Sequence, residues 1–95
     1  MTTDRYPNAM NVNEIMPDLE AVWIVGYERL KNSHNGNPRY SVAFTDGGQY
    51  WSYQTKVDSM VNYEIENMAH RKDLLSVWLT KGRRIYKIAT ILRGL

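Results

Sequence analysis

The apolar and polar residues of this chain mostly alternate in short runs that are separated by turn-forming residues. A turn-rich stretch over 32–38 and a second turn over 46–48 both contain Asn, Asp or Gly. These residues tolerate positive φ angles, and Pro38 cannot donate to a strand ladder. The pattern therefore predicts an antiparallel sheet with strands over 19–31, 39–45, 49–55, 74–80 and 84–92.

The first predicted strand differs from the others along its length. The residues over 21–25 are all apolar, whereas those over 26–31 alternate. A strand that is apolar on both faces and then on one is typical of a strand shared by two halves of a barrel. Gly26 stands where such a strand would bend or bulge.

Helical spacing replaces alternation between the third and fourth strands. Apolar groups at 57, 60, 61 and 65 predict a helix of about two turns, started by a cap from Thr55 or Asp58 and ended by Asn67. Five strands with one short helix between strands 3 and 4 predict an all-β or β-rich α+β fold, a small OB-like or SH3-like barrel. The predicted core consists of Val22, Ile24, Val42, Phe44, Met60, Leu75, Val77, Leu79 and Ile88.

Ninety-five residues are enough for one domain, which we expect over 18–95 after a flexible N-terminal arm over 1–17. The chain has no cysteine, which excludes disulfides, zinc–thiolate sites and thiol nucleophiles and suits a reducing compartment. No apolar run approaches the roughly 20 residues that span a bilayer. We therefore expect a cytoplasmic protein that makes no contact with membranes.

The net charge of +2 is small, but the charge is unevenly distributed along the chain. Residues 1–70 carry −4, and residues 71–95 carry +6, with seven basic groups against Asp73. The positive end could attract a phosphate backbone or an acidic protein face, or could simply keep two hairpin turns soluble.

The string Asn35-Gly36-Asn37-Pro38-Arg39-Tyr40, together with 58–67 and the turn over 82–85, resembles a motif in small proteins of actinobacteria and their phages. The resemblance covers about 20–92. It implies a compact domain of phage or prophage origin, and hence the cytoplasm of a bacterial host. It brings no activity and no site residues with it.

The sequence offers little to catalysis, and we expect no enzyme, no cofactor and no metal site. His34 and His70 fall in predicted turns without partners at ligand spacing. Glu64 and Glu66 are two residues apart and would point away from each other on a helix. A structure in which His70 lies within hydrogen-bond reach of Glu66 in a pocket would support the alternative that the protein is a small hydrolase.

Aromatic residues make up 12% of the chain, and several fall on the less apolar faces of their strands. We expect a partner-binding surface of outward rings bordered by cations, formed by Trp51, Tyr53, Trp78, Tyr86, Arg39, Arg84 and Lys87. Such a surface suits a protein partner, from the host or as a homodimer, because Trp, Tyr and Arg dominate protein hot spots. The alternative is single-stranded DNA or RNA, whose bases stack on rings and whose phosphates bind cations. The same rings could also merely cover a small core.

Overall fold

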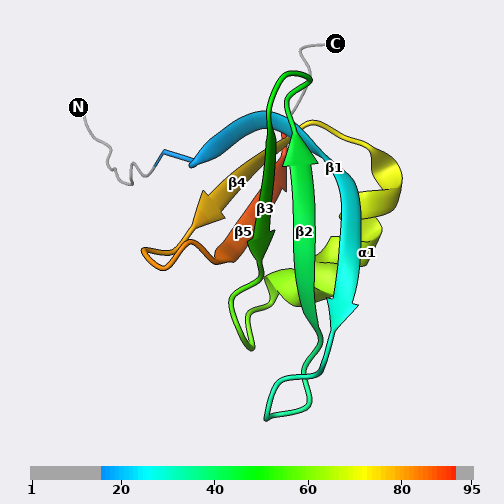
Figure 1. Cartoon of the computed structure of the whole chain (residues 1–95), viewed down its shortest axis with the longest axis vertical. Helices are drawn as coiled ribbons and strands as arrows, with labels where there is room; N and C mark the ends of the chain where they lie inside the picture. Colours follow the sequence, from blue (N-terminus) through cyan, green and yellow to red (C-terminus); the bar gives the residue numbers. More distant parts are fainter. Residues whose placement is uncertain (1–15, 92–95) are drawn as a thin grey trace, which may run out of the picture.

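A computed structural model describes residues 16–91, which form a five-stranded antiparallel sheet and one helix (Figure 1). The elements are β1 (Leu19–Leu30), β2 (Arg39–Thr45), β3 (Tyr50–Gln54), α1 (Val61–Arg71), β4 (Leu75–Leu79) and β5 (Ile85–Thr90). Their order in the sheet is β3-β2-β1-β4-β5. The β-rich fold and the helix between the third and fourth strands are confirmed. The predicted arm over 1–17 lies mostly outside the described residues.

The long strand β1 belongs to both halves of the sheet. Its first residues, Leu19 to Val22, pair with β4, and the residues from Trp23 to Leu30 pair with β2. The register shifts between Glu20 and Val22 and again between Ile24 and Gly26. Such bulges sharpen the bend of a strand. The predicted irregularity at Gly26 is confirmed, and the strand is shared by two halves, although these are halves of an open sheet.

The two outer strands, β3 and β5, approach each other without closing a barrel. One parallel bridge joins Thr55 to Ile85, and the amide of Lys56 donates to the carbonyl of Ile85 over 2.7 Å. The ladder ends there because the chain turns away after Lys56, and Asp58 adopts a φ of 62°. The sequence-based expectation of a closed barrel is therefore wrong, although the sheet curls so that β4 and β5 lie behind β2 and β3 (Figure 1).

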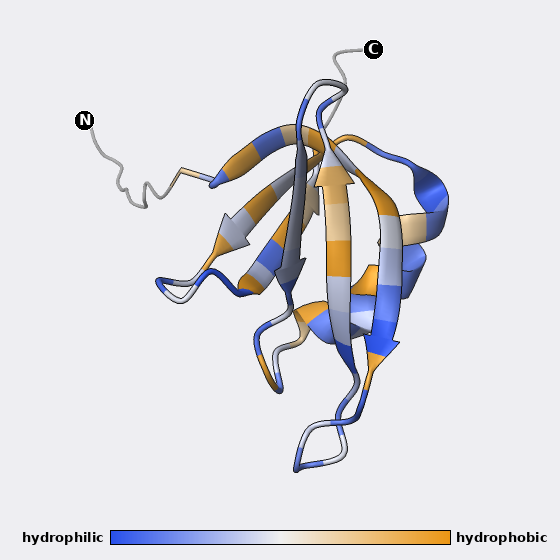
Figure 2. Ribbon diagram, viewed as in Figure 1, coloured by the Kyte–Doolittle hydropathy of each residue, from blue (hydrophilic) through white to orange (hydrophobic). Residues whose placement is uncertain are grey.

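The core lies between the inner face of the curled sheet and α1, and apolar residues alternate along β2 as predicted (Figure 2). Eight of the nine predicted core residues are buried, and the exception is Met60, which is 74% exposed. Leu19, Tyr40, Val61, Ile65 and Ile85 complete the buried apolar cluster. Ile85 and Ile88 both point inward because the β4–β5 register shifts between them, where simple alternation would place them on opposite faces.

The helix begins later and is longer than the spacing predicted. It starts at Val61, has no side-chain cap from Met60, and continues past Asn67 to Arg71. Lys72 ends it in the left-handed conformation, with a φ of 58°. Val61 and Ile65 face the core as expected, whereas Met60 precedes the helix and points away from the core.

Candidate binding surfaces

Arginine side chains gather where β3 approaches β5. We name this region the seam: Tyr53 and Gln54 of β3, Arg83 and Arg84 of the β4–β5 turn, and Arg39 at the start of β2. Arg84 donates through Nη1 to Oε1 of Gln54, and Arg39 donates through Nη2 to the same oxygen over 3.4 Å. Two cationic groups therefore share one neutral acceptor.

Arg83 reaches the same strand from its other face. Its Nη2 donates to the hydroxyl of Tyr53 over 3.0 Å, and its guanidinium lies 5.4 Å from the centre of the Tyr53 ring. Tyr53 pairs with the core residue Val42, whereas Gln54 pairs with Ser41 on the outer face. Arg83 and Arg84 thus hold the edge of β3 from opposite sides.

The seam carries an excess of positive charge. Among the described residues, no carboxylate contacts Arg39, Arg83 or Arg84. Nε of Arg39 is buried without a hydrogen-bond partner, and its second contact, from Nη1 to the carbonyl of Lys31, is also long at 3.4 Å. The fold therefore brings these guanidinium groups together without neutralising them.

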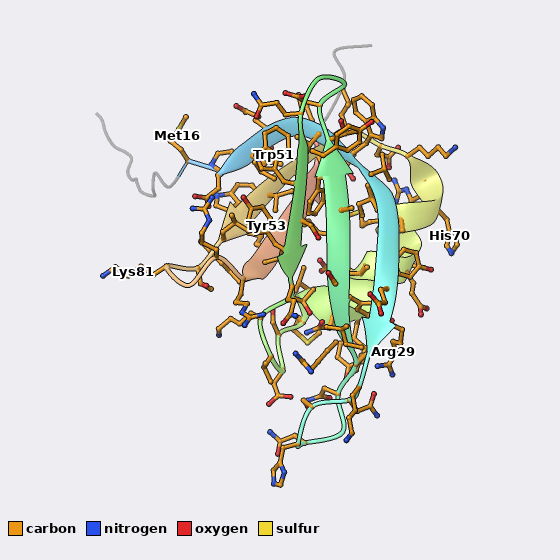
Figure 3. The ribbon with its side chains drawn as sticks, viewed as in Figure 1. Met16, Arg29, Trp51, Tyr53, His70 and Lys81 are labelled. Atoms are coloured by element: carbon orange, nitrogen blue, oxygen red, sulfur yellow. The ribbon has the colours of Figure 1, made fainter. Side chains whose placement is uncertain are left out.

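The structure brings three of the predicted contact residues, Arg39, Tyr53 and Arg84, to the seam. Trp51 lies two residues from Tyr53 on the same face of β3 and pairs with Phe44 (Figure 3). Both rings are half-buried and pack against the core. The expectation that the rings of Trp51 and Tyr53 point outward is wrong, because the register of β3 places them on the core side of the sheet at its open edge.

The other predicted contact residues lie on the second half of the sheet. Trp78 pairs with Lys87 across β4 and β5, and Nζ of Lys87 lies 4.6 Å from the centre of the indole ring. Tyr86 is half-buried and falls at the register shift between these strands. The predicted surface is therefore divided into the seam and the outer face of β4 and β5.

Of the histidines and glutamates considered for catalysis, Glu66 and His70 lie one turn apart on α1 and contact neighbouring tyrosines, whereas His34 lies in a distant loop. His34 is exposed in the loop between β1 and β2, and Glu64 is exposed on the first turn of α1. Glu66 accepts a hydrogen bond from the hydroxyl of Tyr40 over 2.9 Å, whereas His70 packs edge-on to Tyr27 with ring centres 6.3 Å apart. Burial and this bond to Glu66 raise the pKa of Tyr40. Within residues 16–91, no group of three or more His, Asp or Glu could hold a metal ion.

A hollow of about 330 Å³ opens between the bulge of β1 and the end of α1. Its lining is formed by Trp23, Ile24, Val25, Gly26, Tyr27, Ala69 and Lys72. Lys72 is the one charged side chain in this lining. The hollow thus lacks the converging polar groups that acid–base chemistry requires.

The loop between β1 and β2 is fastened by a residue that the sequence analysis had assigned to a helix cap. The Asp58 carboxylate accepts hydrogen bonds from Ser33 Oγ over 2.6 Å and from the side-chain amides of Asn35 and Asn37, each over 2.8 Å. Asn37 in turn accepts a bond from the Tyr63 hydroxyl. The three donors hold the pKa of Asp58 below its usual value. No sequence spacing links this loop to residue 58, so the contact could not be predicted.

Three large apolar side chains are exposed on the segment beside this loop. Val57 is 51% exposed, Met60 74% and Tyr63 53%. We name this set the exposed apolar segment. The helical spacing predicted that Met60 would be buried, and only the later helix start shows that this segment lies at the surface.

Comparisons with known proteins identify no relative: no family model, no curated protein and no solved structure matches the chain. In the part of the chain that the structure describes, the one helix is too short and too polar to cross a membrane.

Proposed function

We propose that this chain is a non-enzymatic binding module whose partner is another protein, either a protein of a bacterial host or a second copy of the chain. The observation that carries the proposal is the exposed apolar segment, where Val57, Met60 and Tyr63 present large side chains to solvent within seven residues of chain. Clustered exposed apolar groups of this kind mark interaction sites on small proteins. Tyr and Met are also enriched at protein interfaces.

The hydrogen bonds of Asp58 support the same proposal because they order the loop beside the exposed apolar segment. Ser33, Asn35 and Asn37 hold the neighbouring loop against the segment that contains Met60 and Tyr63. A surface that is already ordered before binding loses less conformational entropy when a partner arrives. The loop and the exposed apolar segment therefore form one prearranged surface.

We further propose that the domain is an open variant of the OB-like barrel. The strand order β3-β2-β1-β4-β5 and the parallel contact between Thr55 and Ile85 support this arrangement. A helix between β3 and β4 is also consistent with it. A phage or prophage origin rests on the resemblance of the 35–40 motif.

Capture from nuclease-treated bacterial lysate tests the protein partner. Met60→Asp and Tyr63→Ser should each abolish capture of a partner that the unchanged chain retains, because a charge or a lost ring disrupts an apolar contact. Tyr50→Ser is the matched control, since Tyr50 is 75% exposed on a hairpin outside the segment. Self-association is tested with the same variants by sedimentation at several concentrations.

The proposal fails under either of two results. One is a partner, or a dimer, that Met60→Asp and Tyr50→Ser weaken equally. The other is a chain that captures no protein and stays monomeric throughout. Circular dichroism of each variant confirms that the fold is retained before binding is compared.

A further inference from the structure

We infer that Arg39 and Arg84, gathered around Gln54, form a phosphate-binding site for single-stranded nucleic acid, with Arg83 beside them. This site shares no residue with the exposed apolar segment, so the inference does not depend on the protein partner proposed above. It adds a second binding function to the domain.

The first step of the argument is the charge imbalance at the seam. The guanidinium groups of Arg39 and Arg84 both donate to Oε1 of Gln54, which is a neutral oxygen. An amide oxygen cannot neutralise two like charges held this close, whereas an anion can. The contacts of Arg39 are both long, and its Nε has no partner, so the fold itself satisfies this side chain poorly.

The second step is that the neighbouring acidic groups in the described part of the chain form no ion pair with these arginines. Asp18 lies near the β4–β5 turn, but its Oδ2 accepts a hydrogen bond from the amide of Leu79 over 2.7 Å. Asp58 follows β3 closely, but Ser33 and the two loop asparagines occupy its oxygens. Both carboxylates keep their charge but are bonded to other groups, so neither forms an ion pair with Arg39 or Arg84.

The third step is the choice of ligand. Guanidinium groups present planar forks that match phosphate oxygens. The exposed cations Lys81, Arg83 and Arg84 follow one another in the β4–β5 turn, and Lys81 extends outward from it (Figure 3). A row of cations suits a chain of phosphates better than one isolated anion.

The fourth step favours a single strand over a duplex. Trp51 and Tyr53 face the core side of β3, but both rings remain half-buried at its open edge, where Arg83 contacts Tyr53. An unpaired base can contact the exposed part of such a ring and stack on a neighbouring guanidinium, whereas the bases of a duplex are already stacked on one another. The guanidinium of Arg83, which covers Tyr53, offers a further flat cationic surface for stacking.

Fluorescence anisotropy with a labelled oligothymidylate of about 15 nucleotides tests the site. At about 50 mM salt the unchanged chain should bind, and its affinity should fall steeply as salt increases. Arg84→Gln should weaken binding about tenfold and lower the salt slope by about one. The matched control is Arg71→Gln, which removes the same charge from the end of α1, where Arg71 pairs with Asp73 over 2.8 Å. That variant should bind like the unchanged chain.

A second substitution and three competitors complete the design. Arg84→Lys keeps the charge but loses the fork, so it should bind more tightly than Arg84→Gln, and it decides the question if Arg84→Gln does not fold. Duplex DNA, poly-glutamate and inorganic phosphate should compete more weakly than unlabelled oligothymidylate. The inference is overturned if the chain does not bind, if Arg71→Gln and Arg84→Gln weaken binding equally, or if poly-glutamate or the duplex competes as well as the single strand.

Discussion

The carboxylate of Asp58 accepts a hydrogen bond of 2.8 Å from the side-chain amide of Asn37, although 21 residues separate them in the chain. Ser33 and Asn35 add two further bonds to the same carboxylate. The loop between β1 and β2 is therefore held by one acidic group, which stands at a positive φ of 62° outside any helix or strand. The order of this loop and the conformation of the chain after β3 depend on each other.

Asp58→Asn should lower the melting temperature and loosen the 32–38 loop. An amide offers one acceptor oxygen where the carboxylate offers two, and its NH₂ group would face the loop donors. Amide hydrogen exchange should become faster in the loop, whereas the exchange rates of the core strands should change little. Asn67→Ala, on the exposed side of α1, is the control, and equal loop exchange in the two variants would contradict this account.

The same substitution should change how stability depends on pH. The hydrogen bonds favour the charged form of Asp58, so its folded pKa lies below the ordinary value of 3.8. The stabilisation is then present above that value and is lost as the pH falls through the folded pKa. Denaturation measured between about pH 2 and pH 6 should show a smaller acid-induced loss of stability in Asp58→Asn than in the unchanged chain.

Tyr40→Phe should reduce stability by about 1 kcal/mol at neutral pH, because it removes the hydrogen bond to Glu66 from a ring that is 3% exposed. Burial and the bond to Glu66 raise the folded pKa of Tyr40 above 10.0. The neutral phenol is thus favoured in the fold, and its stabilisation is lost as the pH rises through the folded pKa. Tyr40→Phe should accordingly lose less stability than the unchanged chain as the pH rises into the alkaline range. Tyr50→Phe, at an exposed tyrosine, serves as the control.

Thr55→Val should destabilise the domain by about 1–3 kcal/mol, whereas Thr55→Ser should change its stability little. The hydroxyl of Thr55 accepts a bond from the buried amide of Tyr40 over 3.1 Å, next to the bridge to Ile85. Valine fills the same space but leaves that amide without a partner. Urea denaturation of the two variants measures the difference, and equal midpoints would show that the hydroxyl is not needed there.

Phe44→Ala should cost about 3–5 kcal/mol, because Phe44 is fully buried between the sheet and the rest of the core. Tyr50→Ala, on the next strand but 75% exposed, should change stability by no more than about 0.5 kcal/mol. Urea denaturation of both variants provides the comparison. Similar losses of stability in the two variants would contradict the conclusion that Phe44 lies on the buried inner face of the sheet.

Sequence patterns predicted β2 well because buried and less buried residues alternate along most of it. The bounds of β2, Arg39–Thr45, agree with the prediction, since turn residues flank a clean alternation. The irregularity at Gly26 was also predictable, because the change from continuous to alternating apolar residues falls there. The residue pattern within a single segment was sufficient to predict these features.

The features that sequence could not predict depend on contacts between distant segments. The inward rings of Trp51 and Tyr53 follow from the register of β3 against β2, which periodicity within one strand does not specify. Met60 is exposed because the helix begins after it, and Asp58 serves the loop instead of the helix. The meeting of Arg39 and Arg84 requires the curl of the whole sheet. The predicted list contained both arginines, but it did not contain Arg83 or Gln54.

The double pairing of β1 has a mechanical consequence. Its N-terminal part is the only neighbour of β4 on one side, and its C-terminal part is the only neighbour of β2 on one side. Without β1, the remaining strands would form two hairpins, β2–β3 and β4–β5, whose backbones meet only around Thr55, Lys56 and Ile85 among the described residues. Loss of β1 would therefore break both ladders at once, so the two halves of the sheet depend on the same strand.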